Sequence, residues 1–489
     1  MNRIFLALAV SFCFISLTEA YGATPTQKVK NHKQMRREIA NLKQQANQLE
    51  NKIDQMESQL TTVKKTQKRV EKLEKLSVAQ RKSLNSQYYT LGPTVTTSPY
   101  LRLRSAYDAS DLLVNYPTMN EDLRLLGQRQ KVENALKDNV PSYYHPRLVL
   151  SGTVQGQVIY TNPYNAANKA DVDLSTVELD SLAEVGPWAF GFISLDYDNT
   201  ATTGGSRIAN SRVFLKRGFL TLGNLNRLPV YFSIGQMYVP FGQYSNYLID
   251  DPITKVMGRT NQRAVNVGIS RDGFYGQVYG FRGDSKIERT IQSGLNAGYT
   301  FTHTLQNNQS ITTDFGAGMI RNMADSDGMQ STGGTFGGFS TSSATENLRH
   351  AVPALDLHGT VGIEEWTFIG EYIGATEEFD SQDLSYNGHG AKPQSMDAEA
   401  AYNTKIYDKP VTLAGDFGYS WDALALNLPE ASYVGVFNIS LFKDTIESLE
   451  YRHDVNYPGS ATASGQGTSV TPLGRRSQNT IYGQVAVYF

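Results

Sequence analysis

Acidic side chains occupy alternate positions in several otherwise apolar segments of this 489-residue sequence, for example at Asp397 and Glu399. Side chains two residues apart lie on the same face of a β-strand, so such pairs share a face. A buried carboxylate must meet water, pair with a cation or share a proton, because an isolated buried charge is costly. We therefore expect a water-filled interior lined by charges, which serve either a solute path or structural ion pairs. The candidates for this lumen-facing set are Glu178, Asp180, Arg212, Asp314, Asp356, Glu371, Asp397, Glu399, Asp416, Glu450 and Arg452.

A second group of aromatic and charged residues lies in the segment 242–261. A ring of mixed acidic and basic side chains is what a filter for solute size and charge requires. If this segment folds into the interior, it forms a constriction that contacts substrate; otherwise it is an ordinary surface loop. The constriction candidates are Tyr244, Tyr247, Asp250, Asp251, Lys255 and Arg259.

Catalytic chemistry finds little support in the sequence. The seven histidines show no metal-ligand spacing, and no Gly-x-Ser-x-Gly or Gly-rich phosphate loop occurs. Two Asp–His neighbours, Asp356 with His358 and His453 with Asp454, are the nearest approach to a catalytic dyad. We expect a protein that is not an enzyme and that has no cofactor and no metal site.

The elements that must position these residues are strands. In the last strand, Ile481, Val485, Val487 and Phe489 fall on one face, and more polar side chains fall on the other. A tilted strand of this length crosses the hydrocarbon layer of a bilayer, and a terminal aromatic fits an interfacial girdle. The alternative is a soluble edge strand, which would show the same pattern.

Sixteen segments with strand character follow one another from residue 147 onward, and the links between them alternate between long and short. This alternation is typical of outer-membrane barrels, which have long external loops and short periplasmic turns. An even number of strands closes the sheet and leaves no edge in lipid, and sixteen strands are wide enough for an aqueous channel. The predicted strands begin at Arg147, Asp171, Pro187, Arg212, Pro229, Gln262, Gly273, Ser293, Ser310, Ala351, Glu364, Ser395, Val411, Ala431, Thr445 and Gln478.

The N-terminal region has a different character. Residues 1–20 predict a cleaved secretory signal, and the only cysteine, Cys13, lies within it, so a mature chain would form no disulfide. Residues 28–84 carry a heptad pattern of apolar positions with 15 basic and 6 acidic residues between 28 and 82, which predicts a coiled coil that joins chains, with three strands preferred over two. The basic rod either contacts anionic cell-wall polymers or is simply solvated.

These patterns predict an all-β fold, a 16-stranded antiparallel transmembrane β-barrel with an N-terminal periplasmic α-helical coiled coil. We divide the chain into a signal peptide (1–20), a periplasmic coiled coil (21–90), a linker with a short helix that runs from Asn120 to Leu136 (91–146) and an outer-membrane barrel (147–489). The barrel region holds 34 acidic and 23 basic residues, a difference of 34 − 23 = 11 negative charges, which favours cations in a channel. The whole chain has a net charge of −2, which gives no indication of a nucleic-acid partner.

Several stretches resemble a known family. The linker contains Pro-Thr-Met-Asn-Glu-Asp-Leu at 117–123, and the segments 192–198 and 442–454 are similar to the same family. These stretches resemble the legiobactin-receptor type of siderophore porins. The resemblance implies an outer-membrane barrel of about sixteen strands that takes part in the uptake of ferric siderophores, and it supplies no binding residues. A shorter run, 235–242, is similar to one in phosphate-selective porins, which are trimeric and also carry a coiled coil.

The predicted function is therefore an outer-membrane porin for small solutes, by resemblance ferric siderophores, which diffuse through a selective lumen without a plug domain. The expected partners are outer-membrane lipid, the solute and further copies of the chain. The alternative is a structural tether between the outer membrane and the cell wall, in which the pore is incidental.

Overall fold

A computed structural model gives the fold of most of the chain after residue 119. The predicted signal peptide, the coiled coil and most of the linker lie outside the described residues, as does Phe489, so those predictions stay predictions. The structure describes residues 120–136, 147–198, 212–285, 291–304, 310–330, 336, 338–339, 348–442, 444–466, 468–472 and 476–488.

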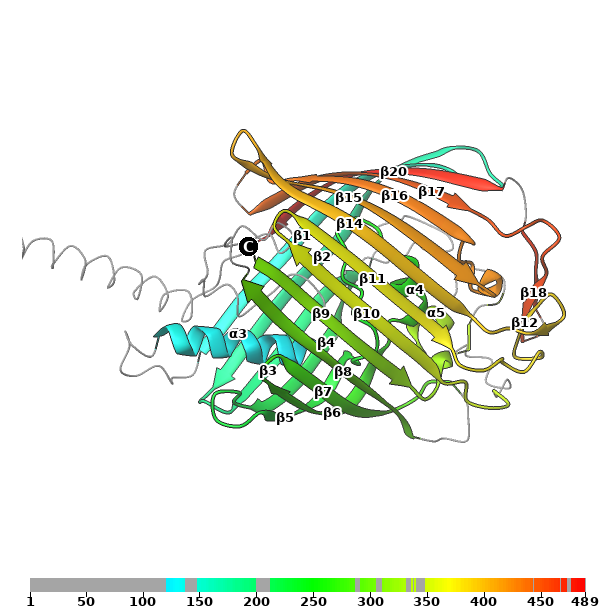
Figure 1. The fold of residues 1–489 in the computed structure, drawn as a ribbon. Coiled ribbons are helices and arrows are strands. Elements are labelled where there is room, and N and C mark those ends of the chain that lie inside the picture. Colours follow the sequence, from blue (N-terminus) through cyan, green and yellow to red (C-terminus); the bar gives the residue numbers. More distant parts are fainter. Residues whose placement is uncertain are drawn as a thin grey trace, which may run out of the picture. The chain divides into compact units, whose positions relative to one another are not determined.

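Sixteen antiparallel strands form one closed barrel, as predicted (Figure 1). No strand begins more than three residues from its predicted start, and the largest shift is Ala351 predicted against Ala354 observed. The barrel strands are β1 Arg147–Asn162, β2 Lys169–Val185, β3 Ala189–Asp198, β4 Arg212–Gly223, β5 Val230–Tyr238, β6 Asn261–Arg271, β7 Phe274–Arg282, β8 Ile291–Thr304, β9 Ser310–Ile320, β10 Ala354–Ile363, β11 Trp366–Ala375, β14 Gln394–Ile406, β15 Lys409–Trp421, β16 Ala431–Ile439, β17 Thr445–Val455 and β20 Ser477–Tyr488.

The barrel closes where β20 pairs with β1, in a register that runs from Thr153 opposite Tyr488 to Asn162 opposite Asn479. In β20, Val485 and Val487 are exposed, whereas Ala486 and Tyr488 are buried. The same alternation recurs around the sheet, because side chains of consecutive strand residues point to opposite faces. The outer face therefore carries the apolar side chains, and the inner face carries most of the predicted charges.

The short links are tight turns at one end of the barrel, which we call the short-turn end. Asp272 and Gly273 join β6 to β7 with φ of 52° and 89°, and Tyr407 and Asp408 join β14 to β15 with φ of 48° and 60°. Two successive residues with positive φ are characteristic of the two-residue hairpin turn that matches strand twist. Gly, Asp and Asn adopt this conformation at lower cost than other residues, which explains why Asp recurs at these turns.

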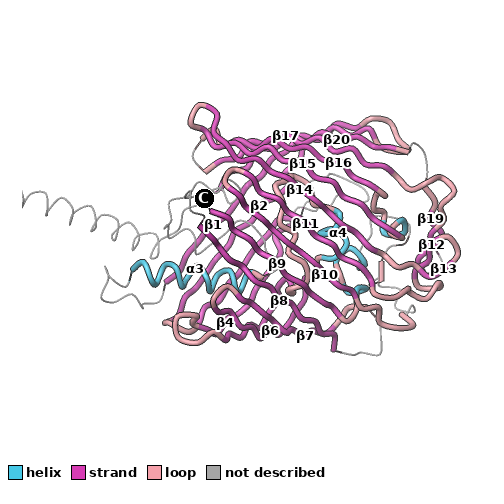
Figure 2. Tube along the Cα trace, in the orientation of Figure 1, coloured by secondary structure: helices cyan, strands magenta, loops and turns pink. Residues whose placement is uncertain are grey.

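The long links lie at the opposite end, which we call the long-loop end, and they carry their own structure (Figure 2). The links after β11 and β17 contribute a four-stranded sheet in the order β13-β12-β18-β19. Its strands are β12 Leu384–Tyr386, β13 His389–Gly390, β18 Ala463–Gly465 and β19 Thr468–Val470, and the short helices of this end are α4 Ile253–Gly258, η4 Met323–Asp325, α5 Asp327–Gln330 and η5 Leu424–Leu426.

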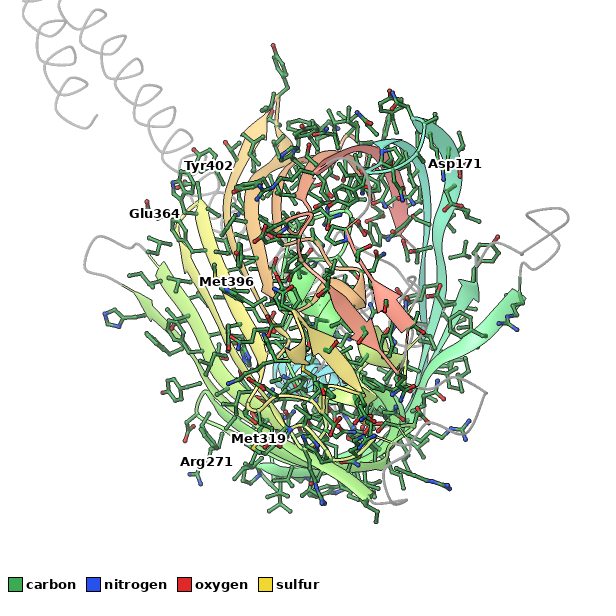
Figure 3. The ribbon with its side chains drawn as sticks, turned by 90° about the vertical axis from the view of Figure 1, so that its right-hand side faces the viewer. Asp171, Arg271, Met319, Glu364, Met396 and Tyr402 are labelled. Carbon is green, nitrogen blue, oxygen red and sulfur yellow. The ribbon has the colours of Figure 1, made fainter. Side chains whose placement is uncertain are left out.

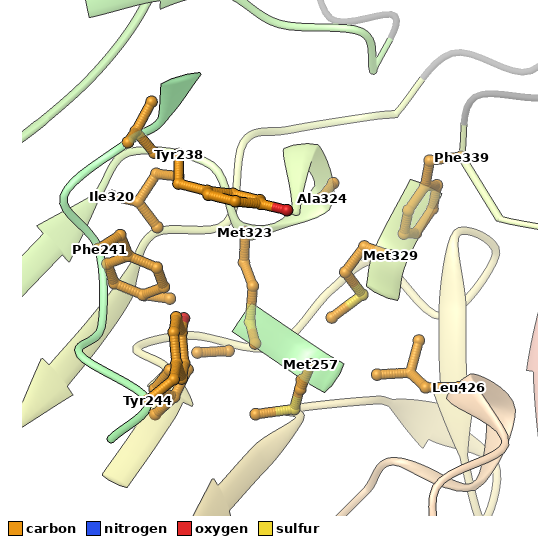
Figure 4. Close-up of a cluster of buried hydrophobic side chains, with 14 of the residues drawn as sticks. Tyr238, Phe241, Tyr244, Met257, Ile320, Met323, Ala324, Met329, Phe339 and Leu426 are labelled. Carbon is orange, nitrogen blue, oxygen red and sulfur yellow. The ribbon is translucent and has the colours of Figure 1, made fainter. Parts of the chain in front are cut away.

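The segment 323–347, which is rich in Gly, Ser and Thr, is mostly buried in the parts that the structure describes. Met323, Met329 and Phe339 belong to a large hydrophobic cluster that also contains Met257 and Leu426 (Figure 4). The few apolar side chains of this segment provide its buried contacts.

The linker contains the predicted helix, α3 Glu121–Leu136, which begins directly after Asn120. In the described part of the chain, no helix is both long and apolar enough to span a membrane.

Candidate functional site

The link between β5 and β6, residues 239–260, folds into the barrel instead of lying on its surface. Its helix α4 packs against β11, β14 and β15. Figure 3 views the barrel from the long-loop end and shows side chains crowding the inside of the wall, while Met319 and Arg271 lie on its outside. This link, which we call the inner loop, lies inside the barrel.

Carboxylates of the inner wall hold the inner loop by its main chain. Glu371 accepts the main-chain N–H groups of Gln243 and Tyr244, both at 2.7 Å. Farther along the loop, Glu399 accepts the N–H of Tyr247 at 3.1 and 3.2 Å. Two more contacts complete the series: Glu450 accepts the N–H of Ile249, and Asp397 accepts that of Thr254 at 2.7 Å.

These four acceptors lie on alternate inward positions of three strands, β11, β14 and β17. These contacts satisfy main-chain N–H groups that would otherwise be buried without a partner. The wall therefore holds the path of the loop through its main chain.

The side chains of the inner loop form a charged network of their own. Asp251 pairs with Lys255 and, at 3.2 Å, with Arg259, which also contacts Asp327 at 3.3 Å. From the wall, Arg452 donates to the main-chain oxygen of Asp251 at 3.0 Å. Although burial opposes it, the nearby Lys255 and Arg259 lower the pKa of Asp251 to about 2. The carboxylate of Asp251 therefore stays ionised at physiological pH.

The six constriction candidates separate into two groups. Tyr244 and Tyr247 are buried against the wall, and Figure 4 shows Tyr244 beside Phe241 and Met257. Asp250 is partly exposed, as are the three residues of the charged network. The tyrosines therefore anchor the loop, and only the charged residues are placed to meet a solute; their role at a constriction remains a prediction.

The lumen-facing candidates mostly lie on the inner face. Ten of the eleven contact the inner loop, α3 or other inward side chains, or are buried on inward positions, whereas Arg212 is exposed at the start of β4. Asp314 accepts hydrogen bonds from Tyr275 and Thr300, both at 3.0 Å. Many of these charges are thus already engaged in contacts within the protein.

The first turns of α3 also pack on the inner wall, toward the short-turn end. Leu125 and Leu126 are 1% and 2% exposed and belong to the hydrophobic cluster that includes Phe192, Phe219 and Tyr231. Figure 1 shows α3 alongside β3 and β4. We predicted this helix as part of a linker, and the sequence did not indicate its contacts with the inner wall.

A cluster of charges joins α3 to the wall. Arg217 is fully buried and donates to Glu121 of α3 and to Glu178 of β2. Its neighbour Lys216 pairs with Glu178 at 2.8 Å and with Asp196 at 2.7 Å. On the other side of the helix, Asp122 accepts from Asn266 at 2.8 Å. The helix is therefore held by both apolar and charged contacts.

Consecutive residues Lys216 and Arg217 both face inward because the β3–β4 register shifts between Ser194 and Leu195. A bulge of this kind turns two neighbouring side chains to the same face. Sequence reasoning missed both cations. The two adjacent cations could have indicated the bulge. In a regular transmembrane strand one of two consecutive side chains faces lipid, where a charge is costly, so a pair of neighbouring cations predicts an irregularity.

Replacing Arg217 by Met is expected to destabilise the barrel by about 3–5 kcal/mol, because three buried carboxylates, Glu121, Glu178 and Asp180, would lose their shared cation. The temperature at which the folded band converts to the unfolded band in gel electrophoresis measures this effect. Arg271→Met is the matched control, since Arg271 is 74% exposed and pairs with Asp272 at a turn. Equal conversion temperatures for the two variants would contradict a stabilising role for Arg217.

The two Asp–His neighbours give catalysis no support. His453 faces the outside and contacts Asn479 at 2.7 Å, whereas Asp454 faces inward and accepts from Ser432 at 2.8 Å. Asp356 does contact His358, but at 0% and 6% exposure neither residue is accessible to a substrate.

The chain matches no protein-family model. A UPF0422 protein of Legionella pneumophila strain Lens is 40% identical to it over 418 residues, which cover 82% of this chain and 78% of that protein. A UPF0422 protein of Coxiella burnetii is 35% identical over 456 residues, which cover 90% and 93% of the two chains.

Two solved structures show low similarity. An anion-selective porin from Comamonas acidovorans aligns with a TM-score of 0.46 and 11% identity, covering 71% of this chain and 100% of the porin. The outer-membrane channel DcaP of Acinetobacter baumannii aligns with a TM-score of 0.42 and 14% identity, covering 70% and 97%.

Proposed function

Because the chain belongs to the UPF0422 family and folds as a closed sixteen-stranded barrel, we propose that it is a channel of the outer membrane for small solutes. The observation that carries this proposal is the contrast between the two faces of the barrel. Outward side chains such as Val172, Leu357 and Leu449 are more than half exposed, while the inner face carries carboxylates and an inserted loop. A closed sheet with an apolar outside is stable in a bilayer because its backbone is fully paired.

Aromatic side chains at both ends of the outer face support the same proposal. Trp366 and Phe368 are exposed near the short-turn end, and Trp421 and Tyr433 are exposed near the long-loop end. Such girdles mark the two interfaces of a transmembrane barrel. In this proposal the short-turn end and α3 face the periplasm.

Solute passage in this proposal is diffusion past the inner loop, with no chemical step. The partly exposed Asp250, Asp251, Lys255 and Arg259 are the proposed contacts for a passing solute. The inward carboxylates outnumber the inward cations, so we expect a preference for cations.

We propose more specifically that the solutes are ferric siderophores. This part of the proposal rests on the resemblance of the linker and strand segments described above. The negative barrel opposes an anionic complex, whereas the cations of the inner loop would attract one. We also propose that the predicted coiled coil at 28–84 joins three chains in the periplasm. The proposed channel carries out no enzymatic reaction.

Conductance in planar bilayers tests the proposed function. The purified full-length protein should give discrete channels whose reversal potential in a KCl gradient indicates cation preference. In cells that lack the gene, uptake of ⁵⁵Fe-labelled ferric citrate, a defined polycarboxylate complex, should fall and should return with the wild-type gene. No channels and unchanged uptake would overturn the transport function and favour the tether; channels with unchanged uptake would remove only the siderophore proposal.

A further inference from the structure

Three buried titratable side chains, Asp356, His358 and Glu371, meet on the inner wall. Asp356 and His358 are two residues apart on β10, and Glu371 lies opposite His358 in the register of β11. One ligand atom from each of the three lies within 4.8 Å of the others. All three side chains point inward, because the two β10 residues share a face and directly paired residues point the same way. The cluster thus brings a nitrogen and two carboxylates together, which the spacing of the histidines in the sequence did not predict.

Charge is unbalanced in this cluster. Asp356 and Glu371 are 0% and 6% exposed, and within the described part of the chain no Lys or Arg forms an ion pair with either of them. His358 Nδ1 lies 2.6 Å from Asp356 Oδ2. The other oxygen, Asp356 Oδ1, is buried and receives no hydrogen bond from the described residues. Buried charges are ordinarily paired or coordinate a metal, so two carboxylates beside one imidazole require a further positive charge.

The second nitrogen of His358 is held in a way that suits a metal ligand. His358 Nε2 lies 3.1 Å from the hydroxyl of Tyr275, which lies 3.0 Å from Asp314. If Tyr275 donates to Asp314, its oxygen accepts the Nε2–H of His358, and the lone pair of Nδ1 is left facing Asp356. Metal-binding histidines characteristically donate their other N–H to an outer acceptor in this manner.

Room for this arrangement comes from glycines on the intervening strands. Gly316 lies opposite His358 and also opposite Gly298, which pairs with Tyr275. A Cβ at Gly316 would stand 2.2 Å from His358 Nε2, and one at Gly298 would stand 2.2 Å from the hydroxyl of Tyr275. Side chains larger than hydrogen at these two positions would therefore break the His358–Tyr275 contact.

We propose that Asp356, His358 and Glu371 bind one divalent transition-metal ion such as Zn²⁺. A neutral imidazole, two carboxylates and a divalent ion sum to zero charge, which suits a buried site. A nitrogen and oxygen ligand set without thiolate suits Zn²⁺, Fe²⁺ or Mn²⁺ better than Ca²⁺ or Mg²⁺, which prefer oxygen ligands alone. Glu371 also holds the main chain of the inner loop, so the ion would lie where loop and wall meet. The site does not depend on the proposed transport function.

Equilibrium dialysis of the tag-free, EDTA-treated, folded full-length protein against Zn²⁺ tests the proposal. The wild type should bind one tight equivalent per chain, and X-ray absorption should show one nitrogen and several oxygen ligands at about 2.0–2.2 Å. Asp356→Asn and His358→Ala should abolish the tight equivalent, and Tyr275→Phe should weaken it at least about 10-fold through loss of the outer contact.

His453→Ala is the matched control, because His453 is a strand histidine on the outer face, and it should bind like the wild type. The folded band in gel electrophoresis identifies variants that assemble, and Glu371→Gln provides a further variant of nearly unchanged shape. If the wild type binds no tight equivalent, or if folded Asp356→Asn and Glu371→Gln bind as the wild type does, the proposal is overturned. The two carboxylates would then share a proton instead.

Discussion

The double variant Glu399→Ala, Glu450→Ala is expected to release the middle of the inner loop and to raise single-channel conductance at least about twofold, since the loop is the constriction in the proposed channel. These carboxylates accept the main-chain N–H groups of Tyr247 and Ile249. Hydrogen bonds are worth about 0.5–1.5 kcal/mol each, so loss of these two contacts shifts the population of the displaced loop by about 5- to 150-fold.

Wall assembly should survive this change, because the strands keep their backbone pairing and two mutually repelling acids are removed. Glu377→Ala is the control, since Glu377 is an exposed acid in the link after β11. Conductance and its fluctuation in planar bilayers are the measurements. A double variant that conducts as steadily as the control would show that the carboxylates do not hold the loop.

The second large effect is expected from Leu125→Asp, Leu126→Asp. Each buried Leu contributes about 1.5–3 kcal/mol relative to exposure, and each new carboxylate would also lose its hydration against an apolar wall. The helix α3 should therefore leave the inner wall, which opens the short-turn end of the barrel. We expect higher conductance, together with trypsin cleavage after Arg124 or Arg129, which are partly or wholly buried in the folded protein.

Gln130→Asp provides the comparison for this pair, because Gln130 lies on the same helix and is only partly buried. Cleavage and conductance show whether the apolar contacts or the charged contacts of α3 hold it on the wall. If the double variant resists trypsin and conducts like Gln130→Asp, α3 is held by its charged contacts alone, and the apolar contacts of Leu125 and Leu126 are dispensable.

The strands of this fold were predictable because in each one apolar and polar side chains alternate along the sequence. Alternation along a strand requires only local sequence, and the Asp and Gly residues of the short turns mark where each hairpin reverses. The inward carboxylates followed from the same rule. Arg212 was placed with them by its phase, which it shares with Lys216, yet it is exposed because it is the first residue of β4, at the long-loop end of the barrel.

The long-range contacts were not predictable in the same way. Nothing in the loop sequence identifies Glu371 as the partner of Gln243 and Tyr244, since the contact uses the main-chain N–H groups that every non-proline residue has. The docking of α3 depends on Phe192, Phe219 and Tyr231, whose inward position is an exception to the polar inner face. The cluster at His358 required knowledge of strand register, because Glu371 is distant in sequence and adjacent only in the sheet.

Because the wall holds the inner loop by its main chain and by the buried Tyr244 and Tyr247, the partly exposed charged side chains of the loop are not its main anchors. In the proposed channel, substitutions at Asp250, Lys255 or Arg259 would alter what passes while the main-chain contacts between loop and wall remain. In this proposal, relatives that retain the four acceptor carboxylates would differ in solute preference through a few loop positions. A library randomised at those positions on an unchanged barrel would be a practical source of channels with new selectivities.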